Sequence, residues 1–192
     1  MKNTIRLVLT FGFIGLCALI ISTPKATVVE SVEVTVAPEE LPAEVIIPVE
    51  ISIESIGVSA PIELVGVLNG AMAVPSLPEN VGWYEFGTRP GEIGSAVLAG
   101  HVNWKNSPNA VFTNLKNIQI GDLIRVTSSD GEVIYFSVNE IKSFPLYSDT
   151  SEVFLSNDGL SHLNLITCSG IWNSIIKSHE SRLVIFATKF DT

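Results

Sequence analysis

Three residues of the chain could together carry out nucleophilic chemistry. Cys168 and His101 each end an apolar run, and Arg182 begins another. A thiolate is a nucleophile, an imidazole with an ordinary pKa of ~6.5 can accept and return a proton, and a guanidinium can stabilise an oxyanion. Taken alone, each has a simpler interpretation: a buried structural cysteine, a surface histidine, and a solvated arginine at a strand end. Together they predict a catalytic group if the strand ends converge on one rim.

The cysteine count supports this interpretation. The chain has two cysteines. Cys17 lies in an apolar N-terminal segment and can be explained as a small apolar residue of a membrane helix. Cys168 then has no disulfide partner in the rest of the chain, and an unpaired thiol outside the cytoplasm is a liability. Two cysteines also exclude a disulfide framework and a four-cysteine zinc site.

Residues 48–192 have the pattern of short strands separated by turn residues. Val49, Ile51 and Ile53 alternate with polar residues, which predicts a half-buried strand. Asp130-Gly131 between two apolar runs is a strong hairpin signal. Eight short strands with few helices predict an all-β fold, a closed or nearly closed β-barrel. We expect strands at 49–56, 62–66, 71–74, 96–100, 122–127, 133–141, 163–168 and 183–189, and helical patches at 110–117 and 151–157.

The first 21 residues have the composition of a membrane segment. Lys2 and Arg6 precede an apolar run over 7–21, which is short for a spanning helix and long for a signal peptide. Signal cleavage is disfavoured because the best site, after Ala26, has Pro24 at the position that needs a small residue. We expect an uncleaved anchor, with a cleaved signal peptide as the alternative. The positive-inside rule places the rest of the chain outside the cytoplasm.

Residues 22–47 form an acidic tether that contains proline. The stretch has three prolines and five glutamates but a single lysine. The flanking prolines favour a tether over a strand, although valines alternate with acidic residues within it. A flexible tether of this length spans on the order of 30 Å. The chain thus divides into an anchor at 1–21, a tether at 22–47 and one domain at 48–192.

Charge and motifs exclude several functions. The net charge of −9, with 11 basic residues, argues against a nucleic-acid partner. The sequence has no phosphate-binding loop, dinucleotide fingerprint or HExxH motif. His162 and His179 lack metal-ligand spacing with Cys168, and no acidic cluster is dense enough for calcium. We therefore expect no cofactor and no metal.

The order of these residues resembles the sortases, the membrane-anchored cysteine transpeptidases of bacteria. Their nucleophile motif, T-L-x-T-C, matches residues 164–168, with Asn164 in place of the first threonine. The family histidine follows a strand as Gly-His, matching Gly100-His101. The family arginine begins the strand after the cysteine, matching Arg182.

The resemblance covers essentially the whole domain. Further matching segments lie between residues 56 and 122, so that the similarity extends from residue 48 to residue 189. The chain is most similar to the small class D to F sortases. The run Thr-Cys-Ser-Gly at 167–170 is similar to class F in particular.

The resemblance implies a sortase-type eight-stranded barrel and a mechanism. Cys168 would attack the threonine carbonyl of an LPxTG-type sorting motif, with His101 as the base and acid and Arg182 stabilising the oxyanion. An amine would then resolve the thioacyl enzyme. The implied partners are surface proteins with sorting signals and an amine acceptor, either a peptidoglycan precursor or a pilin lysine. The implied location is the cell membrane, with a single-pass anchor and an extracytoplasmic catalytic domain.

Three further residues are weaker candidates for the substrate site. Thr167 precedes the cysteine and could shape the oxyanion site, or it could be an ordinary strand residue. Trp104 and Trp172 follow His101 and Cys168 closely and could wall a peptide groove, and core packing explains them equally well.

Other functions remain open at this point. One alternative is a membrane-tethered β-barrel module that binds peptides without catalysis, and another is a hydrolytic cysteine peptidase. An L,D-transpeptidase fits poorly, because its motif needs a glycine before the cysteine and an arginine two residues after it, where Thr167 and Gly170 stand. A papain-like protease would have the cysteine before the histidine, which is the reverse of the order here.

Overall fold

The computed structural model describes residues 46–105 and 107–190. Most of these residues lie in β-strands, and the helices are single turns. The strands are β1 (Pro48–Ile53), β2 (Val58–Val65), β3 (Val67–Leu68), β4 (Ala71–Met72), β5 (Val81–Tyr84), β6 (Gly94–Gly100), β7 (Leu123–Ser128), β8 (Val133–Pro145), β9 (Ser161–Asn173) and β10 (Ser178–Phe190), and the helices are η1 (Glu54–Ile56), η2 (Leu115–Asn117) and α1 (Ser151–Phe154).

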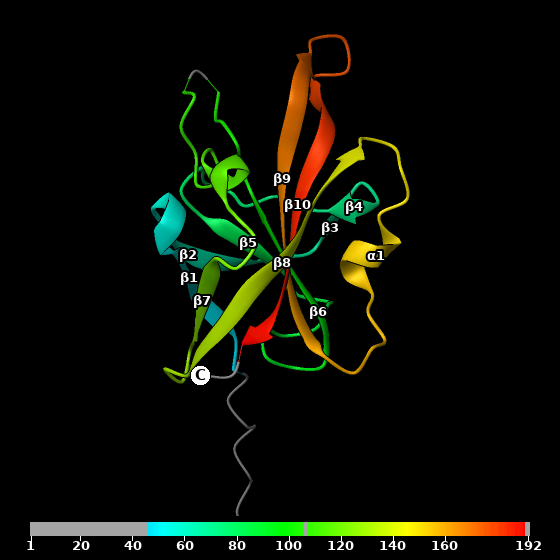
Figure 1. Cartoon of the computed structure of the whole chain (residues 1–192). Helices are drawn as coiled ribbons and strands as arrows, with labels where there is room; N and C mark the ends of the chain where they lie inside the picture. The colour runs from blue at the N-terminus through cyan, green and yellow to red at the C-terminus, as the bar shows by residue number, and fades with distance from the viewer. Residues whose placement is uncertain (1–45, 106, 191–192) are drawn as a thin grey trace, which may run out of the picture. The chain divides into compact units, whose positions relative to one another are not determined.

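Eight of the strands close into a barrel (Figure 1), as the sequence predicts. The order around the barrel is β1-β2-β5-β6-β9-β10-β8-β7. Two neighbouring pairs, β2 with β5 and β6 with β9, are parallel. Because parallel strands point the same way, the C-terminal ends of β6 and β9 lie at the same edge of the barrel.

The predicted number of barrel strands, eight, is right, but one of the predicted strands does not belong to the barrel. The predicted strand at 71–74 is only the two-residue β4, which pairs with β3 in a separate small sheet. The barrel instead includes β5, which the sequence analysis did not predict and which pairs with both β2 and β6. Both predicted helical patches are also shorter than expected: η2 has three residues and α1 has four.

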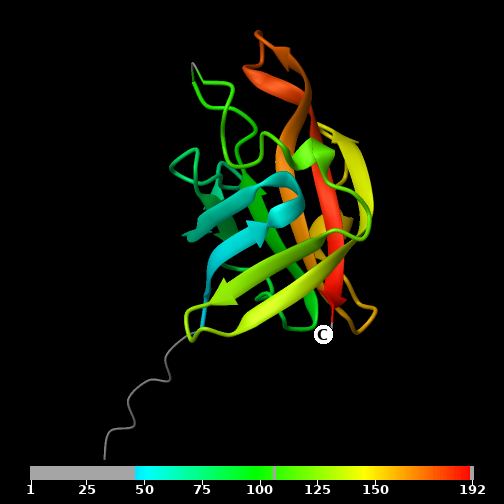
Figure 2. The same cartoon turned by 60° about the vertical axis from the view of Figure 1, so that its left-hand side comes forward.

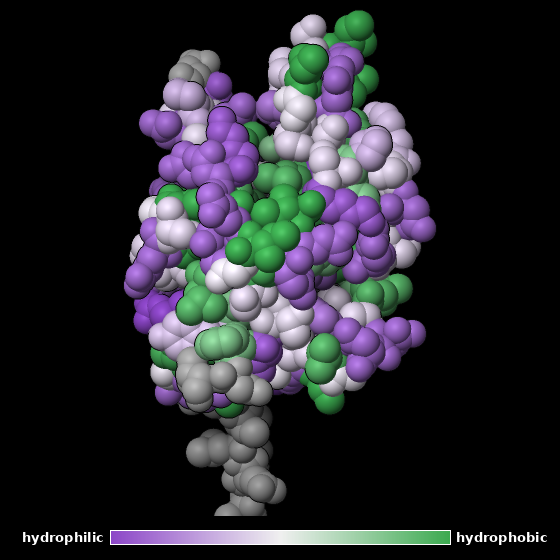
Figure 3. Space-filling model, in the orientation of Figure 1, coloured by the Kyte–Doolittle hydropathy of each residue, from purple (hydrophilic) through white to green (hydrophobic). Residues whose placement is uncertain are grey.

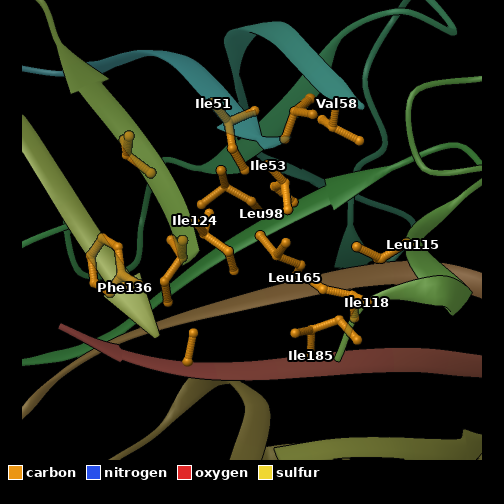
Figure 4. Close-up of a cluster of buried hydrophobic side chains, with 14 of the residues drawn as sticks. Ile51, Ile53, Val58, Leu98, Leu115, Ile118, Ile124, Phe136, Leu165 and Ile185 are labelled. Atoms are coloured by element: carbon orange, nitrogen blue, oxygen red, sulfur yellow. The ribbon is translucent and has the colours of Figure 1, made fainter. Parts of the chain in front are cut away.

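The barrel interior is the main hydrophobic core. All eight barrel strands contribute buried aliphatic or aromatic side chains, and Phe112, Leu115 and Ile118 pack against them. Figure 4 shows Leu98, Leu165 and Ile185, from three neighbouring strands, directed toward this shared centre. Ile51 and Ile53 face inward as predicted, but Val49 is exposed. The cause is a register shift between Pro48 and Glu50 in the pairing of β1 with β7, which interrupts the alternation of faces.

A second hydrophobic cluster lies on the outer side of the barrel wall and holds α1. Val97, Phe144 and Val184 come from β6, β8 and β10, and Val153 comes from α1. On β9, Leu163 and Leu165 belong to the interior core, whereas Ile166 packs against this outer cluster. Cys168 shares the alternating face of Ile166, so its side chain belongs to the outer wall.

The β9–β10 hairpin is the longest feature of the domain. Its strands pair from Thr188↔His162 to Ser178↔Asn173. Figures 1 and 2 show that its turn projects beyond the barrel, and that β10 ends at the opposite end of the molecule. The projecting turn has exposed apolar side chains (Figure 3): Ile171, Trp172, Ile175 and Ile176.

The predicted anchor at 1–21 and nearly all of the predicted tether lie outside the described residues. The last two tether residues, Ile46 and Ile47, are described, and the main-chain N–H and C=O of Ile47 both bond to Ser129. Within residues 46–105 and 107–190, no helix is long and apolar enough to span a membrane.

Candidate active site

Cys168 and Arg182 are direct neighbours across the β9–β10 pair. Their Cα atoms are register partners. From this pair to the pair Thr188↔His162, the register of the two strands has no shift. Because residues opposite each other on antiparallel strands have Cβ atoms about 4.5–5.5 Å apart and point to the same face, both side chains belong to the outer wall. The sheet itself therefore brings the predicted nucleophile and the predicted arginine together.

The parallel β6–β9 pair places His101 beside Cys168. The last paired residues are Ala99 and Ile166, and His101 and Cys168 each stand two residues further along their strands. The Thr167 hydroxyl donates to the Gly100 carbonyl at 2.8 Å, which joins the two strand ends just before the histidine. The expected convergence of the three strand ends thus occurs. No hydrogen bond between the cysteine thiol and the imidazole is present in the described part of the chain.

Thr167 faces the barrel interior, away from Cys168. Its side chain is buried, and its hydroxyl is used by the bond to Gly100. That its side chain contributes to an oxyanion site stays a prediction, and the observed contact is a structural one.

Gly100 allows the segment after His101 to fold back closely. A Cβ on Gly100 would lie 2.4 Å from a ring carbon of Phe112 and 2.8 Å from Val111. The Phe112 amide also donates to the His101 carbonyl at 2.9 Å. The glycine is therefore needed for the close approach of this segment.

The His101 ring has two defined contacts. Its Nε2 donates to the Pro75 carbonyl at 3.0 Å. The Trp104 ring meets it edge-on, with centroids 4.7 Å apart, and the Lys105 ammonium lies 5.0 Å from the Trp104 centroid. With Nε2 donating to a carbonyl, Nδ1 is the nitrogen that remains available to exchange a proton.

Cys168 has a thiol that burial keeps protonated. Removal from water raises the pKa of the thiol above its ordinary value, and the nearby Arg182 guanidinium opposes this rise without cancelling it. The thiol is therefore mostly neutral at pH 7, and a base is required to generate the thiolate.

Arg182 uses part of its hydrogen-bonding capacity within its own strand. Nη1 donates to the carbonyls of His179 at 3.2 Å and Ser181 at 2.9 Å, and Nη2 donates to the Ser178 hydroxyl at 3.2 Å. A guanidinium has five N–H donors, so two remain for a substrate oxygen. The three bonds hold the guanidinium in one orientation.

The two predicted groove tryptophans lie on different walls of the site. Trp104 is half-buried against His101, on the loop after β6. Trp172 lies on the projecting hairpin with 53% of its surface exposed, and its ring contacts the His179 ring at 5.3 Å. Asn103 links the two walls, since its side-chain amide donates to His179 Nε2 at 3.4 Å. Neither tryptophan belongs to the buried core.

An apolar pocket of about 490 Å³ opens on the outer wall and reaches Arg182. Ile166 and Val184 form part of its floor, since they occupy the same faces of β9 and β10 as Cys168 and Arg182. The remaining walls come from β3, β4, β5, α1 and the β8–α1 connection. Its lining residues include Met72, Tyr84, Leu146, Val153 and Phe154.

Several residues of the site were missed by the sequence analysis. Asn164 is buried, and its amide donates to the Val153 carbonyl at 2.6 Å, which fastens α1 to β9. The only sequence signal was that it replaces a family threonine in the nucleophile motif. Pro75 also contributes through its carbonyl, for which the sequence has no signal.

The remaining titratable residues form no metal centre. Among the described residues, no cluster of three or more His, Cys, Asp or Glu side chains could hold a metal ion. His162 lies near the start of β9, away from Cys168, where it contacts Asp158 at 2.9 Å and Thr188 at 3.2 Å.

Comparison with known proteins identifies similar folds and one matching family. A family model described as the sortase domain matches residues 51–190. The sortase D5 transpeptidase of Clostridium perfringens is 25% identical, with a TM-score of 0.57, and the match covers 75% of this chain and 79% of that chain. Sortase C-1 of Actinomyces oris is 26% identical, with a TM-score of 0.61 and 76% of each chain covered.

A third structure supports the fold alone. The lid mutant of sortase A from Corynebacterium diphtheriae is 23% identical, with a TM-score of 0.59, and the match covers 76% of this chain and 71% of that chain. The search of curated protein sequences finds no match.

Proposed function

The chain belongs to the sortase family, and from this premise we propose that it is an extracytoplasmic, membrane-anchored cysteine transpeptidase. We propose that it cleaves an LPxTG-like sorting motif and transfers the acyl fragment to an amine. The observation that carries the proposal is the position of three residues on or just beyond neighbouring strands. Cys168 lies opposite Arg182, and Cys168 and His101 each stand two residues beyond the last pair of β9 with β6. We expect no metal or cofactor in this reaction.

The acylation step needs His101 because the thiol is protonated at rest. Nδ1 of His101 accepts the thiol proton, and the sulfur forms a bond to the scissile carbonyl carbon. The negative charge that develops on the carbonyl oxygen is stabilised by the two N–H donors of Arg182 that are not bonded within the protein. The C–N bond then breaks, His101 returns the proton to the leaving amine, and a thioester remains on Cys168.

The second step reverses these roles with a different nucleophile. An incoming amine loses a proton to His101 as its nitrogen bonds to the thioester carbon. The C–S bond breaks, and the thiolate recovers the proton from His101. Water in place of the amine would give hydrolysis. We propose a peptidoglycan precursor or a pilin lysine as the amine that accepts the acyl group.

The apolar pocket beside Arg182 supports a peptide substrate with an apolar residue. Its floor shares strand faces with Cys168 and Arg182, so a peptide whose carbonyl lies between these two residues can place an apolar side chain in the pocket. Its volume of about 490 Å³ is within the range of ligand pockets. An LPxTG-like motif has a leucine and a proline on the N-terminal side of the cleaved bond, and we propose that one of them occupies this pocket.

We further propose that residues 1–21 anchor the protein in the cell membrane. The support is the sequence: two basic residues followed by an apolar run. In Figure 2, β1 begins at the end of the barrel opposite the projecting hairpin.

The proposed reaction can be tested with a degenerate LPxTG-like peptide library and an amine acceptor. Wild-type protein is expected to give the transpeptidation product, and Cys168→Ala is expected to give none. Without acceptor, wild-type protein should gain the mass of the acyl fragment and lose it on treatment with hydroxylamine. Equal behaviour of wild type and Cys168→Ala would refute the enzyme assignment. Saturable peptide binding without any covalent adduct would support the peptide-binding module instead.

A further inference from the structure

Glu63 lies on β2, outside the three strands that bear the candidate catalytic residues, and its carboxylate holds the loop before β5. The carboxylate accepts the Ser76 amide and, at 3.0 Å, the Ser76 hydroxyl. It also accepts the Asn80 side-chain amide at 2.6 Å. One carboxylate thus fixes both ends of the segment 76–80, a stretch without regular secondary structure.

This loop provides the carbonyl that contacts His101. Pro75 directly precedes Ser76, and its carbonyl accepts Nε2–H of His101 at 3.0 Å. The Ser76 amide, one residue further along, donates to the Glu63 carboxylate. This bond limits where the neighbouring Pro75 carbonyl can lie. A second attachment lies further along, where the Val111 amide donates to the Pro78 carbonyl at 2.8 Å.

The charge of Glu63 also acts on this arrangement. Partial burial opposes ionisation of the carboxyl, but the hydrogen bonds from Ser76 and Asn80 outweigh it, and together with the charge interaction with His101 they lower its pKa below the ordinary value. Glu63 is therefore ionised at neutral pH. The ionised carboxylate makes charge-assisted hydrogen bonds to the loop, which are stronger than neutral ones.

We propose that Glu63 is a positioning residue for the proposed reaction. It holds the Pro75 carbonyl against His101, keeps the neutral ring in the Nε2–H tautomer, and leaves Nδ1 to exchange a proton with Cys168. The inference rests on the proposed catalytic role of His101. Among the described residues, the Glu63 carboxylate bonds to Ser76 and Asn80 and not to Cys168, so its effect is transmitted through the loop and through its charge.

Other charged groups face the site from different elements. Arg182 of β10 acts on Cys168. Lys105 lies over Trp104, whose ring contacts His101, and His179 of β10 bonds to Asn103 on the loop after β6. None of these contacts involves Glu63, so a change in kcat or in the His101 tautomer of Glu63→Gln is assigned to the carboxylate.

The test compares three substitutions of increasing severity. Ser76→Ala removes the hydroxyl donor but keeps the amide donor, Asn80→Ala removes one of the side-chain donors to the carboxylate, and Glu63→Gln removes the charge and turns one acceptor into a donor. We expect kcat of transpeptidation to fall in this order, reaching about 10- to 100-fold for Glu63→Gln. KM should stay within about twofold, because the loop is not proposed to bind the peptide.

The matched control is Glu79→Gln, which makes the same charge change in the same loop on an exposed side chain. It should keep wild-type kcat. Circular dichroism and thermal unfolding identify any variant that fails to fold. If Glu63→Gln fails to fold, Ser76→Ala and Asn80→Ala still test the proposal.

A second measurement does not depend on activity. Long-range 1H–15N spectra of the unliganded protein report the imidazole tautomer, with His101 assigned by comparison with His101→Ala. Wild type should show the Nε2–H tautomer, and Glu63→Gln a mixture. Wild-type kcat in Glu63→Gln, an equal loss in Glu79→Gln, or a loss of kcat with an unchanged tautomer would each overturn the proposal. Failure of the proposed function itself would appear separately, as equal products from wild type and Cys168→Ala.

Discussion

Cys168 and Arg182 are register partners on adjacent antiparallel strands, and this pairing belongs to the most extensive strand contact of the barrel. Their relative position is set by backbone hydrogen bonds on both sides and needs no loop. His101 differs, because it stands just beyond the last paired residue of β6 and is held by contacts to Pro75, Trp104 and the returning segment at Phe112. The site thus combines a rigid pair with a histidine whose placement depends on loops.

The first prediction concerns Arg182 as a donor to the oxyanion. Arg182→Ala should lower kcat/KM by about 10²–10³, the usual cost of removing such a donor. Arg182→Lys should recover little activity, because an ammonium lacks the planar fork that here makes three bonds within the hairpin. Steady-state transpeptidation kinetics provide the measurement.

The control for this experiment is Arg125→Ala. Arg125 pairs with Glu50 at 3.4 Å on the β1–β7 side of the barrel, and both side chains are well exposed to solvent. Wild-type kcat/KM is expected. If Arg182→Lys retained full activity, a positive charge alone would be enough to stabilise the oxyanion, and the proposed role of the planar guanidinium would be refuted.

The second prediction concerns Asn164, which replaces the first threonine of the family motif. Asn164→Ala leaves the buried Val153 carbonyl without its partner and removes side-chain packing beneath α1. We expect the free energy of unfolding to fall by about 1–3 kcal/mol, as measured by denaturant titration. Asn139→Ala is the control, because its amide bonds to Thr188 on the surface. A change within about 0.5 kcal/mol is expected there, and equal losses in both variants would contradict the anchoring role.

The third prediction concerns the close approach at Gly100. Gly100→Ala would place a methyl group 2.4 Å from the Phe112 ring, so the segment after His101 must move. We expect a loss of stability of about 1–3 kcal/mol, with a fall in kcat. Gly66→Ala is the control, since its new methyl group would meet chiefly the flexible end of Glu85 at 2.9 Å. If the clash is the cause, Gly100→Ala should cost less stability in a Phe112→Ala background than in wild type, because the ring that the new methyl group meets is then absent.

The barrel could be predicted from the sequence because most of its strands show a regular alternation or a continuous apolar run. The hairpin at Asp130-Gly131 was predicted correctly, since Gly131 adopts φ 87° and the Ser128 amide and carbonyl bond across the turn. β5 was missed because it has only four residues and includes Gly82, which weakens the strand signal. The apolar run at 71–74 satisfied the pattern, but only two of its residues pair, with β3.

The length of the β9–β10 hairpin was also underestimated. Its outer part has exposed residues on both strands, so the alternation that marks a buried face is lost there. A register shift between His179 and Ser181, next to Gly170 with φ 76°, lets the pairing continue beyond the barrel. Hydrophobic patterning detects strands that face a core, whereas this extension is held by cross-strand pairing and by single bonds from Asn103 and Leu146.

The candidate site was predictable in part. The three strand-end residues could be recognised because their types suit nucleophilic chemistry and their order matches a known family. Glu63 could not be, since a glutamate between Ile62 and Leu64 looks like any half-exposed strand residue. Its importance depends on which loop folds against it, and that contact joins residues 13 to 17 positions apart.

The fourth prediction follows from the protonation state of Cys168. Because burial raises the pKa of the thiol and Arg182 only partly opposes this, the thiolate is the minor form at neutral pH. The rate of alkylation by iodoacetamide should therefore rise about tenfold per pH unit between pH 7 and pH 8, and should level off only above the ordinary range for cysteine, near ~8.5. Loss of the positive charge in Arg182→Ala should move the curve to higher pH and slow alkylation at pH 8, whereas Arg182→Lys should keep the wild-type curve. Mass spectrometry of the alkylated Cys168 peptide measures these rates. A fast, pH-independent rate from pH 6 upward would show instead that the thiolate is the resting form, and His101 would then be needed only to protonate the leaving amine.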